Sequence, residues 1–345
     1  MIGIRADAND VVATGHIMRC ITIAKELQKR GEDVFFFLAD EYGVSMLKEQ
    51  DMPYCVMHTD WENPKEEQEI LCREIATRGI STMLFDSYRL DREYFELLRS
   101  RLKQKVRMAY IDDLFEDVYP VDVVINYNAY HTQFPYEEAY GKKCSAELCL
   151  GPSFVPLREE FGRDNLCDGN EKTVLLSCGG GDVLQSLYKT LNMAVEDKRF
   201  AGVTFHVVLG RFHQQKERLE ELANKYGNIK LHYNVTNMAE LMEENRIAVS
   251  AAGTMLYELC AMERPTVFFV TADNQKYDSD FFAQDDRMLF AGDFRKEEDA
   301  CIAHILDGMD ILLTNVKLCD EMKGKLRRVT DGKGAGRIAE ALIQK

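Results

Sequence analysis

Short apolar runs alternate with amphipathic stretches along the first half of the chain. The runs are rich in β-branched and aromatic residues, which is typical of strands buried on both faces. The predicted strands lie within IGIRA (2–6), EDVFFFLA (32–39), TMLFDS (82–87), RMAYIDD (107–113) and VDVVINY (121–127). Between them, apolar residues recur at helical spacing over 16–30, 44–50, 65–78 and 91–104. Buried strands separated by helices predict an α/β fold with a parallel, doubly wound sheet.

The same pattern restarts in the second half of the chain. Its predicted strands lie within TVLLSCGGGD (173–182), FHVVLG (205–210), IKLHYNV (229–235), IAVSAAG (247–253) and PTVFFVTA (265–272). The segment 151–170 separates the halves with two prolines and several charges, and it is the best domain boundary. We therefore expect two Rossmann-like domains, 1–157 and 171–345, which face each other across a cleft. The amphipathic tail GKGAGRIAEALIQK (332–345) is expected to close the second domain as a helix.

Length and composition agree with this picture and narrow the classes of partner. A chain of 345 residues exceeds the size at which single cores usually stop growing. The net charge of −15 argues against nucleic acid or an anionic membrane as the main partner, although a helix start can still hold a phosphate. No apolar run has the length of a membrane span, and no secretory signal pattern precedes the first strand. The ten cysteines form no CxxC pair and suggest reduced thiols, so we expect a cytoplasmic protein without membrane insertion.

The first loop of interest follows the first predicted strand, because ligands of such sheets bind beyond the carboxyl ends of the strands. Arg5 and Asp7 lie at this edge, and Gly15 and His16 open the next helix. The positive end of a helix disfavours an imidazolium, so we expect a neutral His16 ring that can accept a proton near pH 7. A capping or surface histidine is the alternative that this position leaves open.

Two other strand ends in the first half carry polar residues. In FDSYRLD (85–91), Tyr88 follows an acidic residue, which suits either a substrate hydrogen bond or an ordinary turn. Asp112 and Asp113 are adjacent, and neighbouring residues of a strand point to opposite faces. No histidine or cysteine completes a ligand set with them, so we expect no metal site.

In the second half, two loops have the composition of anion-binding turns. The glycines of SCGGGD, among them Gly180 and Gly181, allow backbone amides to approach a phosphate, although a tight turn explains them equally well. In SAAGTMLYELC, Gly253 permits close approach and Thr254 can cap a helix whose free N–H groups suit a diphosphate. Glu258 lies one turn further, where it can reach ribose hydroxyls or form part of a solvated helix face. The polar residues Asn274 and Gln275 stand at the end of the following strand.

Taken in order, these segments resemble a known family. They resemble the UDP-sugar hydrolases of pseudaminic acid biosynthesis and related predicted glycosyltransferases of spore-coat polysaccharide synthesis. The segments that carry the resemblance are RAD, TGHIMRCITIAKEL, FDSY, IDDL, CLGPSFVPLREEF, SCGGGD, SAAGTMLYEL and DNQ. The resemblance covers nearly the whole chain, and GHIMRC and AAGTMLYE are its most specific parts. The second half also looks like the UDP-GlcNAc-binding half of the peptidoglycan glycosyltransferase that makes lipid II.

This resemblance implies a GT-B fold that binds the nucleotide in the C-terminal domain and needs neither a metal at the diphosphate nor a cofactor. It implies that water attacks the anomeric carbon of UDP-2,4-diacetamido-2,4,6-trideoxy-β-L-altrose, which gives UDP and a free sugar for nonulosonic acid synthesis. His16 matches the histidine that activates this water, and Glu258 matches the glutamate on the uridine ribose. The other expected contacts are Tyr88 at the reaction centre, Asn274 and Gln275 at the sugar or diphosphate, Gly180, Gly181, Gly253 and Thr254 at the diphosphate, and Arg5, Asp7 and Gly15 on the substrate side.

The sequence leaves other readings open. A glycosyltransferase would use the same fold and donor, with His16 deprotonating a sugar or lipid hydroxyl in place of water. A non-catalytic sugar-nucleotide-binding protein is a third reading, and the absence of GxGxxG argues against an NAD enzyme. The chain departs from the family pattern in the glycine loop CGGGDV and at Arg246, Glu263, Arg264 and Lys276. None of these departures touches His16 or Glu258.

Overall fold

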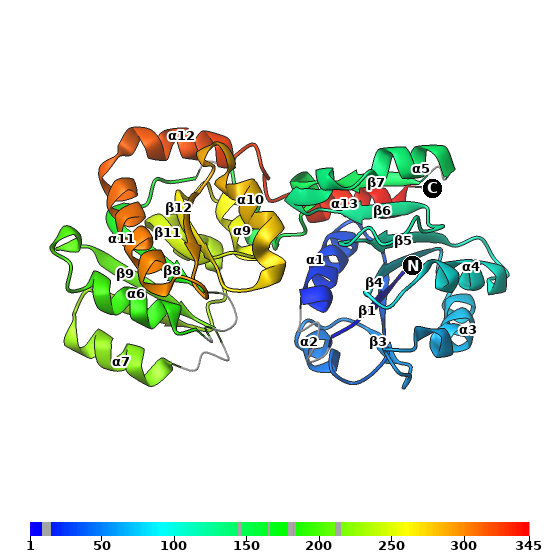
Figure 1. Cartoon of the computed structure of the whole chain (residues 1–345). Helices are drawn as coiled ribbons and strands as arrows, with labels where there is room; N and C mark the ends of the chain where they lie inside the picture. Colours follow the sequence, from blue (N-terminus) through cyan, green and yellow to red (C-terminus); the bar gives the residue numbers. More distant parts are fainter. Residues whose placement is uncertain are drawn as a thin grey trace. The chain divides into compact units, whose positions relative to one another are not determined.

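The chain forms two compact units in the computed structural model (Figure 1). The first unit comprises Met1–Arg158 together with Lys333–Lys345, and the second comprises Glu159–Gly332. The structure describes residues 1–345 except 9–14, 144–145, 165, 179–181, 183, 211–214 and 345, and except the side chains of 142, 143 and 274. The junction between the units falls within the segment 151–170, where the sequence places the domain boundary.

A parallel sheet of seven strands forms the centre of the first unit. Its strands are β1 (Ile2–Ala6), β2 (Val34–Leu38), β3 (Tyr54–Val56), β4 (Thr82–Asp86), β5 (Arg107–Ile111), β6 (Val123–Asn126) and β7 (Glu147–Leu150). Their order in the sheet is β3-β2-β1-β4-β5-β6-β7. Every residue of β1, β2, β4 and β6 is buried, which explains why their sequences are apolar runs without alternation.

Helices cover both faces of this sheet. They are α1 (Gly15–Lys29), α2 (Val44–Glu49), α3 (Gln68–Arg78), α4 (Arg92–Arg101), α5 (Tyr136–Lys143) and α13 (Gly334–Ile343), with the 3₁₀ turns η1 (Pro64–Glu67), η2 (Ala129–Gln133) and η3 (Pro152–Phe154). Helices α1 and α13 pack together on one face, whereas α3 and α4 lie on the other (Figure 1).

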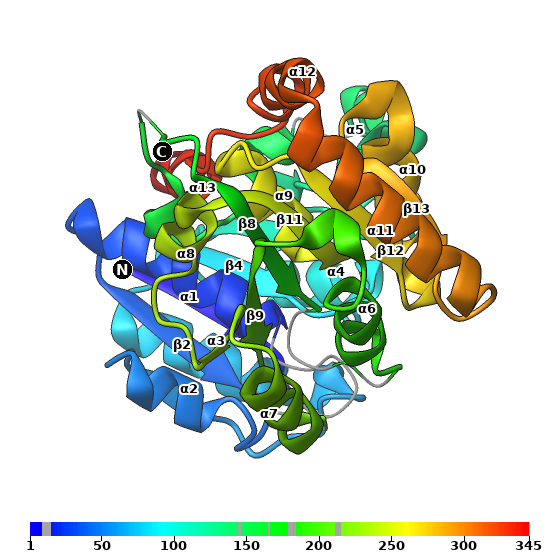
Figure 2. The same ribbon diagram turned by 90° about the vertical axis from the view of Figure 1, so that its left-hand side faces the viewer.

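The second unit repeats this architecture with six parallel strands. They are β8 (Asn170–Ser177), β9 (Thr204–Leu209), β10 (Ile229–Tyr233), β11 (Asn245–Ala251), β12 (Thr266–Val270) and β13 (Leu289–Asp293), in the order β10-β9-β8-β11-β12-β13. The helices are α6 (Ser186–Ala194), α7 (Lys216–Lys225), α8 (Met238–Glu244), α9 (Thr254–Ala261), α10 (Lys276–Ala283), α11 (Glu298–Thr314) and α12 (Val316–Leu326), and the 3₁₀ turns are η4 (Glu159–Phe161), η5 (Lys198–Phe200), η6 (Asp273–Gln275) and η7 (Gln284–Asp286). Helices α6, α7 and α11 lie on one face of the sheet, and α8 and α9 cover the other (Figure 2).

Both strand orders reverse direction next to the first strand of the unit. The chain moves outward from β1 to β3 and returns to β4 on the other side of β1, and β8, β10 and β11 repeat this path. The predicted doubly wound α/β fold is confirmed for both units. Such a reversal opens a crevice beyond the carboxyl ends of the strands, which is where ligands bind in these sheets.

The last helix lies in a different unit from the one predicted. We expected it to close the second domain, but α13 packs against α1 and β4 of the first unit. The Thr82 hydroxyl donates a hydrogen bond to the Leu342 carbonyl over 3.3 Å. An amphipathic pattern shows that one face of a helix is buried but does not select the sheet that buries it, which is why the prediction was wrong.

The sequence pattern also missed the strands β3, β7 and β13. All three are edge strands, and each contains half-buried residues in place of a fully buried run. Edge strands are short and exposed on one side, so they do not give the continuous apolar signal of central strands.

Two of the departures from the family pattern serve the folding of the second unit. The guanidinium of Arg264 is buried and donates hydrogen bonds to the carbonyls of Met262, Asn245 and Cys167. Burial lowers the pKa of Arg264 from its ordinary value. Its neighbour Glu263 accepts both hydrogen bonds of a bidentate pair with Arg327, at 2.6 and 2.7 Å. These residues fasten the ends of β11 and α9 to adjoining segments.

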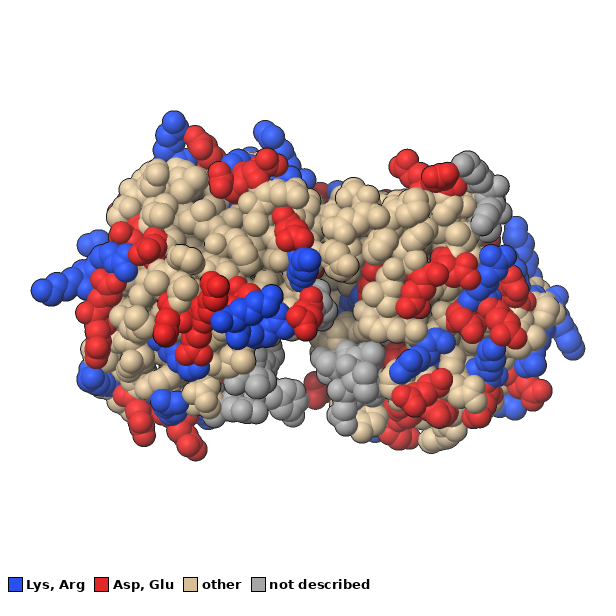
Figure 3. Space-filling model, in the orientation of Figure 1, with Lys and Arg blue, Asp and Glu red and all other residues tan. Residues whose placement is uncertain are grey.

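The surface carries charges of both signs. On the face shown in Figure 3, acidic and basic side chains are interspersed over both units, and no broad basic area of the kind that binds a nucleic acid backbone interrupts them. Among the described residues, no helix is both long enough and apolar enough to cross a membrane.

Candidate functional site

The polar residues of the first unit converge at the carboxyl end of β4. Asp86 is the last residue of β4, which pairs with β1 at the point where the strand order reverses. His16 lies in the first turn of α1 and is buried. Its Nδ1 lies 2.9 Å from Oδ1 of Asp86, although the two residues are 70 positions apart in the sequence. The predicted helix-start position of His16 is therefore correct, but the ring faces a carboxylate in the interior.

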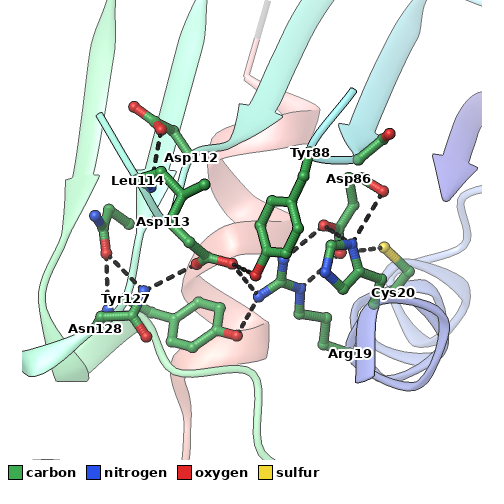
Figure 4. A network of polar contacts seen from close by, with 12 residues as sticks. Arg19, Cys20, Asp86, Tyr88, Asp112, Asp113, Leu114, Tyr127 and Asn128 are labelled. Carbon is green, nitrogen blue, oxygen red and sulfur yellow. Dashed lines mark hydrogen bonds and ion pairs between the residues drawn. The ribbon is translucent and has the colours of Figure 1, made fainter. Parts of the chain in front are cut away.

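Arg19 approaches the same carboxylate from the next turn of α1. Its Nε donates to Asp86 Oδ2 over 2.6 Å, and its Nη2 donates to Asp86 Oδ1 over 2.5 Å. Its Nη1 donates to Asp113 Oδ2 over 2.9 Å and to the Tyr127 hydroxyl over 2.5 Å. Figure 4 shows the guanidinium between the two carboxylates, with Tyr127 below it. A fork of this kind fixes the direction as well as the distance of its acceptors.

Asp113 links this network to Tyr88. It accepts hydrogen bonds from the Tyr88 hydroxyl at 3.0 Å and from the Asn128 amide at 2.9 Å (Figure 4). The ring of Tyr88 meets that of His16 edge to face, with centroids 4.5 Å apart. Tyr88 is 41% exposed, so of these side chains it is well placed to touch a ligand directly.

The charges of the network determine its protonation. Burial disfavours the charged imidazolium, but the Asp86 carboxylate outweighs this effect and raises the pKa of His16 above its ordinary value. Burial also opposes ionisation of Asp86, yet the charges of Arg19 and His16 hold the pKa of that carboxyl below its usual range. The shift in the pKa of His16 is opposite in direction to the one that we expected from the helix terminus, because the buried carboxylate favours the imidazolium.

The arrangement fixes how the His16 ring can react. An ionised carboxylate only accepts hydrogen bonds, so Nδ1 of His16 carries the proton that it shares with Asp86. The other ring nitrogen, Nε2, then holds the lone pair of the neutral form. A carboxylate behind Nδ1 also stabilises the imidazolium that forms when Nε2 takes a proton. This pair can therefore act as a general base.

Arg5 and Asp7, which we expected on the substrate side, belong to a buried ion-pair cluster. Arg5 is completely buried and its Nε lies 2.9 Å from both carboxylate oxygens of Glu67. Its Nη1 donates to Asp7 over 2.5 Å, and the Tyr94 hydroxyl donates to Glu67 over 2.8 Å. In this structure Arg5 thus holds the end of β1 and the 3₁₀ turn η1 together, and it offers no surface to a ligand. Gly15, the first residue of α1, is exposed.

The adjacent carboxylates Asp112 and Asp113 follow β5, which ends at Ile111, so strand alternation does not apply to them, and they point into different surroundings. Asp112 accepts hydrogen bonds from the Tyr136 hydroxyl and the Phe115 backbone N–H, at 2.9 and 2.8 Å. Burial raises the pKa of Asp112 to about 6. Among the described residues, no group of three or more histidine, cysteine, aspartate or glutamate side chains is arranged to hold a metal ion.

In the second unit, the aspartate of SCGGGD organises the start of α6. Asp182 accepts hydrogen bonds from the backbone N–H groups of Ser186 and Leu187, each over 2.8 Å, and from the Ser186 hydroxyl over 2.6 Å. It therefore satisfies N–H groups at the start of α6. The predicted phosphate contacts Gly180 and Gly181 lie outside the described residues.

The start of α9 differs in one detail from the prediction. Gly253 is the N-cap with φ 143° and ψ −163°, a conformation that favours glycine, and no side chain caps the helix. Thr254 is the first helical residue and is exposed, so the expectation that its hydroxyl caps the helix is wrong. A Cβ added to Gly253 would meet no atom of the described residues within 4 Å. Glu258 is half-buried in the second turn of α9.

The DNQ segment forms the 3₁₀ turn η6, directly after β12. The carboxamide oxygen of Gln275 accepts hydrogen bonds from the backbone N–H groups of Thr271 and Ala272, at 2.8 and 3.2 Å. Gln275 thus shapes the end of β12 from within the turn. The side chain of Asn274 lies outside the described residues.

Sequence reasoning missed most of the polar network that begins at His16. The missed residues are Arg19, Asp86, Asp113, Tyr127 and Asn128, which come from α1, β4 and the segments after β5 and β6. One signal was available: Arg19 follows His16 by three residues and so shares its helix face. The polar ends of the apolar runs at Asp86 and Asp113 gave a second signal, because parallel strands bring such ends to one edge.

Comparison with known proteins found distant relatives in sequence, and no protein-family model matches the chain. The UDP-2,4-diacetamido-2,4,6-trideoxy-β-L-altropyranose hydrolase of Campylobacter jejuni is 25% identical over 254 residues, which cover 74% of this chain and 85% of the relative. The spore coat polysaccharide biosynthesis protein SpsG of Bacillus subtilis is 22% identical over 345 residues, covering 99% of this chain and 97% of the relative. An uncharacterized protein of Methanocaldococcus jannaschii is 22% identical over 293 residues, and the match covers 80% of this chain but only 56% of that longer protein.

Solved structures resemble the whole chain at low sequence identity. MurG of Acinetobacter baumannii superposes with a TM-score of 0.65 and 14% identity, over 99% of this chain and 98% of that one. A glycosyltransferase of Rickettsia africae superposes with a TM-score of 0.62 and 14% identity, over 100% and 99% of the two chains. The chain therefore has the GT-B fold of these glycosyltransferases, and its sequence is similar to proteins named for UDP-sugar hydrolysis and for spore-coat polysaccharide biosynthesis.

Proposed function

We propose that the chain is an enzyme that hydrolyses a UDP-sugar at the anomeric carbon and releases UDP and the free sugar. The proposed substrate is UDP-2,4-diacetamido-2,4,6-trideoxy-β-L-altrose or a close relative, and the sugar would enter the synthesis of a nonulosonic acid of the pseudaminic type. The observation that carries the proposal is the His16–Asp86 pair at the carboxyl edge of the first sheet. The similarity to the Campylobacter hydrolase supports the choice of substrate.

In the proposed reaction, His16 acts as the general base. Its Nε2 takes a proton from water while the water oxygen forms a bond to the anomeric carbon, and the bond from that carbon to the diphosphate oxygen breaks. The electron pair leaves with UDP, and the proton remains on His16 beside Asp86. Tyr88 contacts the sugar from the exposed side of His16.

The second unit binds the nucleotide in this proposal. The N-terminal N–H groups of α9 face the diphosphate and meet the charge that develops as UDP leaves, so no metal is needed there. Glu258 binds the ribose hydroxyls from the second turn of the same helix. Asn274, Gln275, Gly180 and Gly181 complete the diphosphate and sugar contacts.

Glycosyl transfer is the second candidate function. The solved neighbours include proteins titled glycosyltransferases, and the Bacillus relative is named for polysaccharide biosynthesis. The same base would then remove the proton from a sugar or lipid hydroxyl, which would attack the anomeric carbon in place of water. The two reactions differ only in the acceptor.

Release of UDP from the purified protein distinguishes these functions. We expect the diacetamido-altrose substrate to release UDP without any acceptor and in the presence of EDTA. The matched variant His16→Asn should lose at least about 100-fold in turnover, the range expected for removal of a general base.

The controls separate the alternatives. UDP release that requires an added acceptor would reject hydrolysis in favour of transfer. Binding of the UDP-sugar without turnover, under either condition, would reject both enzymes and support a sugar-nucleotide-binding protein.

A further inference from the structure

Arg19 donates four hydrogen bonds within the first-unit site, and the proposed reaction gives it no role. We propose that Arg19 is a positioning residue that shares the carboxylate of Asp86 with His16 and thereby sets how strongly His16 holds a proton. This inference rests on the proposed function only where it concerns activity, because the protonation of His16 can be measured without a substrate.

His16 and Arg19 both reach the carboxylate of Asp86. Oδ1 of Asp86 lies 2.5 Å from Nη2 of Arg19 and 2.9 Å from Nδ1 of His16, so one oxygen serves both groups. Oδ2 accepts from Nε of Arg19 over 2.6 Å. Arg19 and His16 are three residues apart on α1 and reach the carboxylate from the same side of the helix.

Contacts on the other side of its guanidinium hold Arg19 against Asp86. Its third nitrogen, Nη1, is held by Asp113 Oδ2 at 2.9 Å and by the Tyr127 hydroxyl at 2.5 Å. Asp113 is itself held by Asn128. The Arg19 side chain is only 11% exposed. A planar guanidinium fixed at three nitrogens keeps both carboxylates in place, which a flexible ammonium group cannot do.

The charges around His16 act on its proton in opposite directions. The titratable groups of the network are Asp86 and Tyr88 at the end of β4, Arg19 and Cys20 on α1, Asp113 after β5 and Tyr127 after β6, with Asp7 after β1 near Cys20. Two carboxylates favour the imidazolium, and Arg19 is the cation that opposes it. Without Arg19, His16 would face Asp86 and Asp113 alone and would hold its proton to higher pH.

The test is an NMR titration of His16 in the histidine-labelled full chain, with its signal identified by its loss in His16→Asn. Arg19→Gln should raise the titration midpoint of His16 by about one pH unit, because it removes an adjacent charge. Arg19→Lys keeps the positive charge, so its titration midpoint should stay closer to that of the wild type. The control Lys25→Gln removes a cation from an exposed position of the same helix and should leave the midpoint unchanged.

If Arg19→Gln does not fold, the titration midpoint of His16 can be measured in Asp113→Asn instead. This substitution removes a carboxylate from the same network and should lower the His16 midpoint. An unchanged or lowered midpoint in folded Arg19→Gln, or an unchanged midpoint in Asp113→Asn, would overturn the proposal.

Activity then reports the same effect separately. In Arg19→Gln, the acid limb of the pH profile for UDP release should move to higher pH in parallel with the NMR midpoint, since the base must be neutral. If the wild-type chain releases no UDP, the proposed function fails while the titration still decides the role of Arg19. A lower rate with an unmoved acid limb would indicate a purely structural role for Arg19 and reject the proposal.

Discussion

The carboxyl edges of the two sheets have the same topology and opposite chemistry. At the first edge, beside β1 and β4, charged side chains fill the interior: Asp86 contacts His16 and Arg19, and Arg19 also contacts Asp113. At the second edge, between β8 and β11, small residues lead into the start of α9 at Gly253, where backbone N–H groups remain at the helix end. One edge presents ionisable side chains, and the other presents main-chain donors.

This difference shows that the strand order determines where a ligand site can form, whereas the side chains at that edge determine its chemistry. Both edges lie where a doubly wound sheet binds ligands. A buried network of acids and bases can move protons, whereas a helix start with a glycine N-cap can hold an anion. We therefore expect substitutions at the first edge to change rate and pH dependence, and substitutions at the second to change nucleotide affinity.

The largest expected effect is that of Asp86→Asn at the first edge. Loss of the carboxylate should reduce UDP release by about 100- to 1,000-fold, because His16 loses the partner that orients it and stabilises its imidazolium. The Asp86 carboxylate raises the pKa of His16, so its removal should also move the acid limb of the pH profile to lower pH. Steady-state rates between pH 5 and 9 measure both effects.

Asp51→Asn is the matched control, since it makes the same chemical change in an exposed turn with φ 53°, which asparagine tolerates. A wild-type rate in Asp86→Asn would refute the base assignment. If the acid limb moves to higher pH, the assignment of Asp86 as the group that raises the pKa of His16 is contradicted, even if the rate falls.

The next effect concerns the stability of the first unit. Glu67→Gln removes one of the two ionised partners of the completely buried Arg5 and leaves only Asp7, which should cost about 1.5–3 kcal/mol of the free energy of unfolding. Urea unfolding followed by fluorescence measures this change. The neighbouring exposed variant Glu66→Gln should stay within about 0.5 kcal/mol of the wild type. Equal stability of the two variants would show that the Arg5 cluster is not structural and would restore Arg5 as a candidate substrate contact.

The smallest effect is expected at the second edge. Glu258→Gln should weaken UDP binding by about tenfold, the scale of a lost hydrogen bond to a charged group, because the carboxylate is proposed to bind the ribose. Titration calorimetry with UDP measures the affinity. The control Glu263→Gln breaks an exposed ion pair with Arg327 just after α9 and should bind UDP normally. If both variants bind like the wild type, Glu258 does not hold the nucleotide.

Much of the fold follows from local sequence patterns. The buried runs that became β1, β2, β4 and β6 were recognisable because strands covered on both faces need apolar residues throughout. The edge strands β3, β7 and β13 lacked that signal since one side of each is open. The unit that takes up α13 was decided by packing against α1 and β4, which no local pattern encodes.

The sequence by itself determined two doubly wound α/β units and placed His16 and Gly253 at helix starts on their carboxyl edges. Only the tertiary structure decided what surrounds them. His16 meets Asp86 across 70 positions and Arg19 meets Asp113 across 94, so their charges and pKa values depend on contacts that the fold creates. The physical reason is range: backbone pattern is set by neighbours in the chain, whereas the strength of an acid or base is set by neighbours in space.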